Sequence, residues 1–269
     1  MQVNNKYRPV YHASVHEAWS NDPNGLIFHE GKVHLFFQHY PHEAQWGPMH
    51  WGHFSTEDFI SWEEHPVALY PDRDYEVICG CWSGYSFEKD GKLWLMYTAA
   101  QPELQRQCLA YSEDGIHFEK VENNPVLSAD MLDKEVSPRD FRDPKVIKKG
   151  DYYYCLAGTR IINPVLFKRR AEKIAKAEAL KAVSPSAYNA QKEVKKEEEF
   201  TVVRIDEDHA VNPCTGEYDQ NDLYHVPVLG RTEREALGNG NMILFRTKDF
   251  EHFEYLGKLF EPQEGFDKE

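Results

Sequence analysis

Two aspartates stand in short motifs whose residue types could support nucleophilic or acid–base chemistry. Asp22 lies in the run Asn-Asp-Pro-Asn-Gly at residues 21–25, and Asp143 directly follows Arg142. Each motif alone has a structural explanation, because Asp-Pro and Asn-Gly form turns and neighbouring Arg and Asp residues form salt bridges. Two carboxylates that face one sugar-sized pocket, however, are what glycoside hydrolysis requires. One attacks or stabilises an oxocarbenium-like centre, while another carboxyl group donates a proton.

Two further stretches offer groups that suit a sugar-binding pocket. Residues 46–53 read Trp-Gly-Pro-Met-His-Trp-Gly-His, and Trp82 is followed by Ser83. Indole rings can stack on the apolar faces of sugars, and a hydroxyl can form hydrogen bonds with them. Packing in a hydrophobic core explains Trp51 and His53 equally well.

A repeat in the sequence predicts the elements that position these residues. Gly31, Gly91 and Gly150 each open a short apolar run, and they recur at intervals of about 60 residues. A Ser/Thr-x-Asp turn before an aromatic residue also recurs, at residues 56–58, 112–114 and 247–249. Each repeat has room for about four short strands, which is typical of β-propeller blades and predicts an all-β fold. A β-sandwich is the alternative, but it gives no reason for two signals to recur in step.

The alignment of the repeats predicts where the chemistry lies. Asp22, Ser83 and Asp143 each precede the glycine of their repeat by about eight residues, in or just before the first strand of a blade. First strands surround the central channel of a propeller, so we expect these side chains to converge at its mouth.

The third repeat is interrupted by additional sequence. The second interval between aspartate turns is about 80 residues longer than the first, and we assign the excess to residues 160–239. The first half of this insertion is rich in Lys, Glu and Ala and predicts one or two charged surface helices, whereas its second half predicts an irregular loop. We interpret it as a solvated decoration of the third blade. A lid or an oligomer contact is the alternative.

The composition argues against several kinds of partner. The chain has 31 Lys and Arg against 45 Asp and Glu, a net charge of −14, which disfavours nucleic acid and membrane surfaces but not neutral sugars. Its five cysteines have neither disulfide-framework nor zinc-site spacing, so we expect free thiols and no metal site. The sequence has no apolar leader and no run of about 18 apolar residues, so we expect a cytoplasmic location.

Taken in order, the motifs resemble glycoside hydrolase family 32, which contains invertases, sucrose-6-phosphate hydrolases, levanases and inulinases. The matching elements are Tyr11-His12, residues 21–25, 35–38 and 50–53, Ser55, Trp62, and residues 82–84 and 142–144. Each motif is short, but the ordered set is specific. The match runs to about residue 160 and resumes at about residue 240.

This resemblance implies a five-bladed β-propeller followed by a β-sandwich, and a retaining hydrolysis of β-fructosyl linkages. It makes Asp22 the nucleophile and Asp143 the transition-state stabiliser that holds sugar hydroxyls. It assigns contacts with the substrate to Asn21, Gln38, Trp46, Trp82, Ser83 and Arg142. No metal and no organic cofactor is implied, because acid–base chemistry needs neither.

The sequence departs from the family pattern in three places. Ser20 stands where the family usually has Met, and Trp82 stands where Phe is common. The family's proton donor is a Glu in a Glu-Cys pair that opens the fourth blade, and this sequence contains no Glu-Cys pair. Glu261, Glu264 and Glu269 lack the context of that motif, and the repeat places the donor at about residue 280.

We therefore expect residues 1–269 to form a partial catalytic propeller of about three blades, with the C-terminal blades and the β-sandwich absent. A missing C-terminal region or a second chain would complete the propeller. The 269-residue chain alone is expected to be inactive.

The expected substrate is a small sugar or an oligosaccharide. Sucrose, sucrose 6-phosphate and fructans are not distinguished by the sequence. Two other interpretations stay open: a propeller glycosidase that acts on arabinose or xylose units, and a non-catalytic sugar-binding or remnant propeller.

Overall fold

The computed structural model describes residues 9–102, 104–162 and 238–259. Within them the chain forms twelve β-strands and one short 3₁₀ helix, η2 (Ala129–Met131). The prediction of an all-β fold is confirmed for this part of the chain. None of its helical segments is long and apolar enough to cross a membrane.

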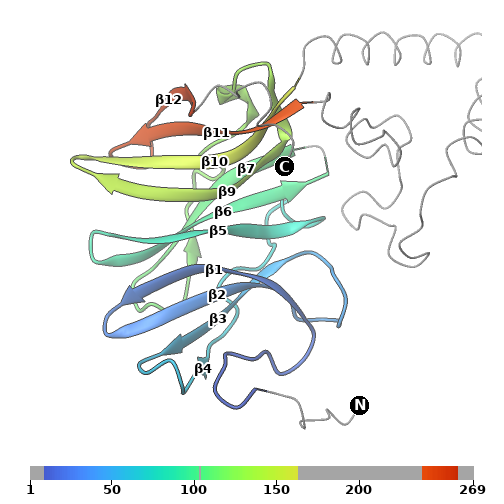
Figure 1. Ribbon diagram of the computed structural model, residues 1–269, viewed down its shortest axis with the longest axis vertical. Helices are drawn as coiled ribbons and strands as arrows, with labels where there is room; N and C mark the ends of the chain where they lie inside the picture. Colours follow the sequence, from blue (N-terminus) through green and yellow to red (C-terminus); the bar gives the residue numbers. More distant parts are fainter. Residues whose placement is uncertain (1–8, 103, 163–237, 260–269) are drawn as a thin grey trace, which may run out of the picture. The chain divides into compact units, whose positions relative to one another are not determined.

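The strands form three four-stranded sheets, and each sheet takes its strands in chain order (Figure 1). The first contains β1 (Trp19–His29), β2 (Lys32–Tyr40), β3 (His50–Thr56) and β4 (Glu63–Glu64). The second contains β5 (Gly80–Lys89), β6 (Lys92–Gln101), β7 (Leu104–Ser112) and β8 (Glu119–Lys120). The third contains β9 (Val136–Lys149), β10 (Tyr152–Ile162), β11 (Gly238–Thr247) and β12 (Phe253–Lys258). The expectation of four strands per repeat is confirmed.

The chain divides into two compact units. The first comprises Met1–Asp133, Pro138–Thr159 and Met242–Leu259. Of the second unit, the structure describes only residues 134–137, 160–162 and 238–241, which include ends of β9, β10 and β11. The candidate site lies wholly in the first unit.

The repeated glycines close the hairpin between the first and second strand of each sheet. In the first two sheets the turn has two residues, since His29 pairs with Lys32 and Lys89 pairs with Lys92. Both turn residues have positive φ, namely 47° and 85° for Glu30-Gly31 and 53° and 74° for Asp90-Gly91. This is the type I′ turn that matches the twist of a hairpin, and it favours glycine because side chains are strained there.

The repeated aspartates close the turns after the third strand. One carboxylate oxygen of Asp58, Asp114 and Asp249 accepts hydrogen bonds from the backbone N–H groups two and three residues further on, at 2.7–2.9 Å. These bonds are the main reason that the pKa of Asp58 and Asp249 is lowered, while for Asp114 the hydrogen bond with the His117 ring contributes most. The predicted Ser/Thr-x-Asp turns are therefore confirmed in all three sheets.

The main apolar core joins the first and second sheets. Phe36 and Trp51 from the first sheet and Leu95 and Tyr97 from the second are all fully buried in one cluster. His53 is 1 % exposed and stacks on Phe36, with ring centroids 4.3 Å apart. For Trp51 and His53 the core interpretation is the correct one.

Four cysteines lie among the described residues, and all four are buried free thiols: Cys79, Cys81, Cys108 and Cys155. Residues 163–237, which contain nearly all of the expected 160–239 insertion, lie outside the described residues. In the chain they fall between β10 and β11, which are neighbours in the third sheet. Cys214, Glu261, Glu264 and Glu269 also lie outside the described residues.

Candidate active site

The first strands of the first two sheets are bulged at the residues that the repeat singles out. In β1, Ser20 lies opposite His39 and Pro23 opposite Phe37, so β1 carries one extra residue around Asn21 and Asp22. In β5, Trp82 lies opposite Thr98 and Gly84 opposite Tyr97, so the extra residue is Ser83. A bulge turns side chains out of the regular alternation of a strand, and bulges recur beside active sites for that reason.

The two bulges meet across the boundary between the first and second sheets. Ser83 Oγ donates a hydrogen bond of 3.3 Å to Asp22 Oδ2. Asp22 is otherwise exposed, so its second carboxylate oxygen is open to a ligand. Asn21, its neighbour, is exposed too, and its side-chain oxygen accepts a hydrogen bond of 2.7 Å from Trp19 Nε1.

Asp143 lies in β9, the first strand of the third sheet, as the repeat predicted. Its φ is 55°, in the left-handed region that residues other than glycine seldom adopt. Such a conformation costs about 1–3 kcal/mol and persists only where the surroundings enforce it, often at functional sites. Here the Asp143 N–H donates a hydrogen bond of 3.1 Å to Thr98 Oγ1, and Thr98 is fully buried.

The electrostatics of Asp143 connect it with both Asp22 and Arg142. Partial burial raises the pKa of the Asp143 carboxyl, the Arg142 guanidinium opposes this rise, and the negative charge of Asp22 adds to it. Arg142 Nε lies 3.9 Å from Asp143 Oδ2, and the side chain of Asp143 is 61 % exposed. Solvent therefore screens these effects in part. The Asp22 carboxylate is therefore close enough to act on the Asp143 carboxyl, as a ligand shared by the two would require.

The strand segment that carries Trp82 and Ser83 is held from several sides. Gln38 Nε2 donates to Cys81 O at 3.0 Å, Trp51 Nε1 donates to Trp82 O at 3.1 Å, and Trp82 Nε1 donates to Cys79 O at 3.0 Å. Gln38 is only 2 % exposed. Its role as a contact with substrate stays a prediction, and the contact that it makes in the structure is with the backbone before Ser83.

At the start of the same strand, Gly80 approaches the backbone of Met49, the residue directly before β3, too closely for any side chain. Its φ is 98°, and a Cβ atom there would lie 2.1 Å from the Met49 nitrogen. Hydrogen bonds from Met49 N to Cys79 O and from Cys81 N to Met49 O, at 3.0 and 2.8 Å, join the two sheets at this point. Gly80 is therefore required for the contact that places Trp82 and Ser83 beside β1.

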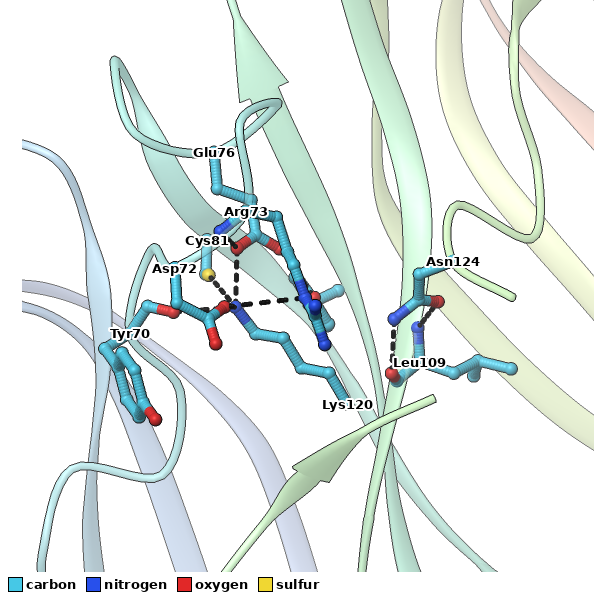
Figure 2. Close-up of polar contacts among 9 residues, drawn as sticks. Tyr70, Asp72, Arg73, Glu76, Cys81, Leu109, Lys120 and Asn124 are labelled. Atoms are coloured by element: carbon cyan, nitrogen blue, oxygen red, sulfur yellow. Dashed lines mark hydrogen bonds and ion pairs between the residues drawn. The ribbon is translucent and has the colours of Figure 1, made fainter. Parts of the chain in front are cut away.

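A buried ion pair anchors the loop that leads into β5 (Figure 2). Lys120 Nζ lies 2.5 Å from Glu76 Oε2 and 2.6 Å from Asp72 Oδ1, and it also donates to the Tyr70 carbonyl. Glu76 is fully buried, and its other oxygen accepts a hydrogen bond of 2.7 Å from the Tyr97 hydroxyl. No feature of the sequence pointed to this cluster, because Lys120 follows Asp72 by 48 residues and Glu76 by 44 residues.

Trp46 completes the set of residues selected from the sequence. It lies half-buried in the connection between β2 and β3. No hydrogen bond or ring contact described in the structure joins it to Asp22 or Asp143. Among the residues that the structure describes, no group of three or more His, Cys, Asp or Glu side chains is arranged to hold a metal ion.

Comparison with known proteins identifies the family. Residues 12–169, more than half of the chain, match the family described as "Glycosyl hydrolases family 32 N-terminal domain". The chain belongs to glycoside hydrolase family 32. This confirms the resemblance drawn from the ordered motifs, and the matched residues include both Asp22 and Asp143.

Curated relatives of this family 32 chain are similar over more than half of its length. A sucrose-6-phosphate hydrolase from Zymomonas mobilis is 41% identical over 172 residues, which are 59% of this chain and 31% of that protein. A levanase from Bacillus subtilis is 41% identical over 168 residues, which are 58% of this chain and 24% of that protein. The chain thus matches about a third or less of the length of these relatives.

Solved structures of family 32 enzymes extend the similarity. A β-fructofuranosidase from Bombyx mori superimposes with a TM-score of 0.60 at 28% identity, covering 96% of this chain and 39% of that one. A sucrose-6-phosphate hydrolase from Lactobacillus gasseri gives a TM-score of 0.58 at 21% identity, covering 94% of this chain and 37% of that one, and supports the fold alone.

Proposed function

We propose that this chain carries the nucleophile and the fructosyl-binding groups of a retaining glycosidase that releases fructose from β-fructosyl linkages. The proposal rests on the hydrogen bond of 3.3 Å from Ser83 to Asp22. Asp143 lies close enough for the Asp22 charge to raise its pKa. The relatives named as sucrose-6-phosphate hydrolase, levanase and invertase support the same reaction class.

In the proposed mechanism, Asp22 attacks the anomeric carbon of the fructosyl unit. The bond from Ser83 occupies Oδ2 and fixes the carboxylate, which leaves Oδ1 for the attack. As the bond to the anomeric carbon breaks, the glycosidic oxygen takes its proton from a carboxylic acid other than Asp22 and Asp143, and a covalent fructosyl ester forms on Asp22. Water then releases fructose with retention, while Asp143 and Arg142 hold sugar hydroxyls beside the reacting carbon.

The three sheets are proposed to be blades of a five-bladed propeller. Their first strands, β1, β5 and β9, carry Asp22, Ser83 and Asp143 respectively. Side-chain hydrogen bonds join neighbouring sheets at these strands, as in Ser83–Asp22 and Thr98–Asp143. Such an arrangement is what blades around a common axis would give.

The proton donor is the part of the mechanism for which the sequence offers no motif. No Glu-Cys pair occurs in the 269 residues, and we do not assign the role to Glu261, Glu264 or Glu269. We propose that the 269-residue chain binds fructose but does not hydrolyse sucrose or fructan. The same observation favours a second candidate function, a non-catalytic fructose-binding propeller.

A substrate whose leaving group needs no proton separates these two functions. β-Fructofuranosyl fluoride expels fluoride without acid assistance, so a competent Asp22 should give a burst of fluoride and a fructosyl ester detectable by intact-protein mass spectrometry. The adduct should map to the peptide that contains Asp22 and be absent from Asp22→Asn. Fructose binding without any adduct would favour the non-catalytic function. The absence of both would refute the proposal.

A further inference from the structure

Near their ends, the second strands of the first two sheets carry polar side chains, Gln38 and Thr98, that bond to the next sheet. Gln38 and Thr98 stand at the same distance after the repeat glycines Gly31 and Gly91. Gln38 bonds to the backbone of β5 at Cys81, and Thr98 bonds to the backbone of β9 at Asp143. Both side chains are at most 2 % exposed. The first sheet therefore binds β5 directly before Trp82, and the second sheet binds β9 at Asp143, so each contact lies beside or at a candidate site residue.

Thr98 belongs to a buried hydrogen-bond network that binds β9 at the N–H and the carbonyl of Phe141 and at Asp143. Thr98 Oγ1 donates to Gln107 Oε1 at 3.0 Å, and Gln107 Nε2 donates to Phe141 O at 2.6 Å. Gln105 Oε1 accepts hydrogen bonds from Phe141 N at 2.9 Å and from Arg142 Nη1 at 3.4 Å. None of the three network side chains is more than 5 % exposed. Side chains of the second sheet thus bond three backbone groups between Phe141 and Asp143: the Phe141 N–H, the Phe141 carbonyl and the Asp143 N–H.

The pairing in this network fixes which atom donates and which accepts. A threonine hydroxyl has one proton and can accept as well. The proton goes to Gln107 Oε1, because the Asp143 N–H can only donate. The lone pairs of Thr98 are therefore directed at the Asp143 nitrogen. Buried polar groups are costly when left unpaired, so loss of the hydroxyl would leave the Asp143 N–H and Gln107 Oε1 without partners.

The backbone of Asp143 needs such support because its φ of 55° is unfavourable for an aspartate. We propose that Thr98 and Gln107 are positioning residues that hold Asp143 and Arg142 in the orientation needed to bind the fructosyl unit. This inference rests on the proposed function, because its test measures fructose binding. It extends that function to residues that touch no substrate and that act through the backbone of the next sheet.

A structural role alone and a positioning role predict different results for Thr98→Val. Valine has nearly the volume of threonine but lacks the hydroxyl, whereas Thr98→Ser keeps the hydroxyl. Thr159→Val is the matched control, because Thr159 in β10 is also buried, at 8 % exposure, and its hydroxyl has no partner. We expect Thr98→Val to bind fructose about tenfold more weakly, and Thr98→Ser and Thr159→Val to stay within about twofold of wild type.

The test measures fructose affinity by isothermal titration calorimetry and the unfolding midpoint of the same 269-residue variants. The proposal is supported if Thr98→Val, still folded at the assay temperature, loses fructose affinity while Thr98→Ser and Thr159→Val keep it. It is overturned if folded Thr98→Val binds fructose as wild type does. Thr98→Ala replaces Thr98→Val if the latter does not fold, with the same two outcomes.

Amide hydrogen exchange distinguishes failure of this inference from failure of the proposed function. If wild type binds no fructose, the proposed function fails, and exchange at the Asp143 amide decides the positioning claim. Faster exchange at Asp143 in Thr98→Val, with the amides of β7 unchanged, supports the claim. Equal protection in wild type and Thr98→Val overturns it.

Discussion

Replacement of Lys120 by Met should be among the most destabilising single changes in the second sheet. The Lys120 side chain is 7 % exposed and neutralises Glu76, which is fully buried. Removing one member of such a pair leaves an uncompensated buried charge, which costs about 3–5 kcal/mol. Asp72, the second partner, is 36 % exposed and can be solvated, so the penalty arises mainly from Glu76. For a domain of this size the loss corresponds to a fall of about 6–20 °C in Tm.

The assay is urea denaturation of the 269-residue chain, followed by tryptophan fluorescence, for Lys120→Met, Glu76→Gln and the double variant. The double variant should cost less than the sum of the single variants, because neither buried charge is then left alone. Lys92→Met is the control, since Lys92 pairs with Glu113, whose side chain is 74 % exposed, and its loss should leave the midpoint unchanged. A cost below about 1 kcal/mol for Lys120→Met, the range of surface pairs, would refute the reasoning.

Three further predictions concern the site and the core. Asp22→Asn should lower fluoride release from fructosyl fluoride by several powers of ten with an unchanged Tm, and retention of about a tenth of the rate would contradict the nucleophile assignment. Sucrose and fructan hydrolysis by the purified 269-residue chain should be undetectable in a glucose- and fructose-release assay, and measurable turnover would mean that another carboxyl group supplies the proton. Burial, with smaller effects of His65 and His34, lowers the pKa of His53 to about 2. Below about pH 6.5 the unfolded chain therefore binds a proton at His53 that the folded chain excludes, so the stability that His53 contributes is full above that pH and falls by about 1.4 kcal/mol per unit as the pH decreases. His34 and His50, whose pKa burial lowers to about 4, add to the same pH dependence. In urea denaturation at several pH values, His53→Phe should reduce the slope of stability against pH by about the share of one histidine; an equal slope in His53→Phe would contradict the assignment.

The elements that could be predicted from the sequence are those whose cause is local. A glycine with positive φ in a two-residue hairpin and an aspartate that binds the next backbone N–H groups act within four residues. Their recurrence identified the three sheets, and it placed Asp22, Ser83 and Asp143 in the first strand of each. Because residue types mark the turns, the number of strands in each repeat could also be predicted.

The geometry of the site could not be predicted, because its causes are not local. The extra residue at Asp22 and at Ser83 is visible only when each strand is paired with its neighbour. The Glu76–Lys120 pair joins residues 44 positions apart, and neither residue type nor spacing marks it in the sequence. Thr98 lies in the apolar stretch that follows Gly91, and only the structure gives it a hydrogen-bonding partner on the next sheet.

Residues on the first strands and residues on the second strands have different roles in the site. A first strand that is bulged or bent into the left-handed region presents its carboxylate well but cannot maintain that conformation alone. The second strand of the preceding sheet is largely buried and is paired with a strand on each side, so a polar side chain near its end is held rigidly. Gln38 thereby fixes the Cys81 carbonyl, two residues before Ser83, and Thr98 fixes the Asp143 N–H. Substitutions that change the chemistry at a first strand should therefore be tolerated by the fold, whereas substitutions at Gln38 or Thr98 should disturb the site while leaving its reactive groups in place.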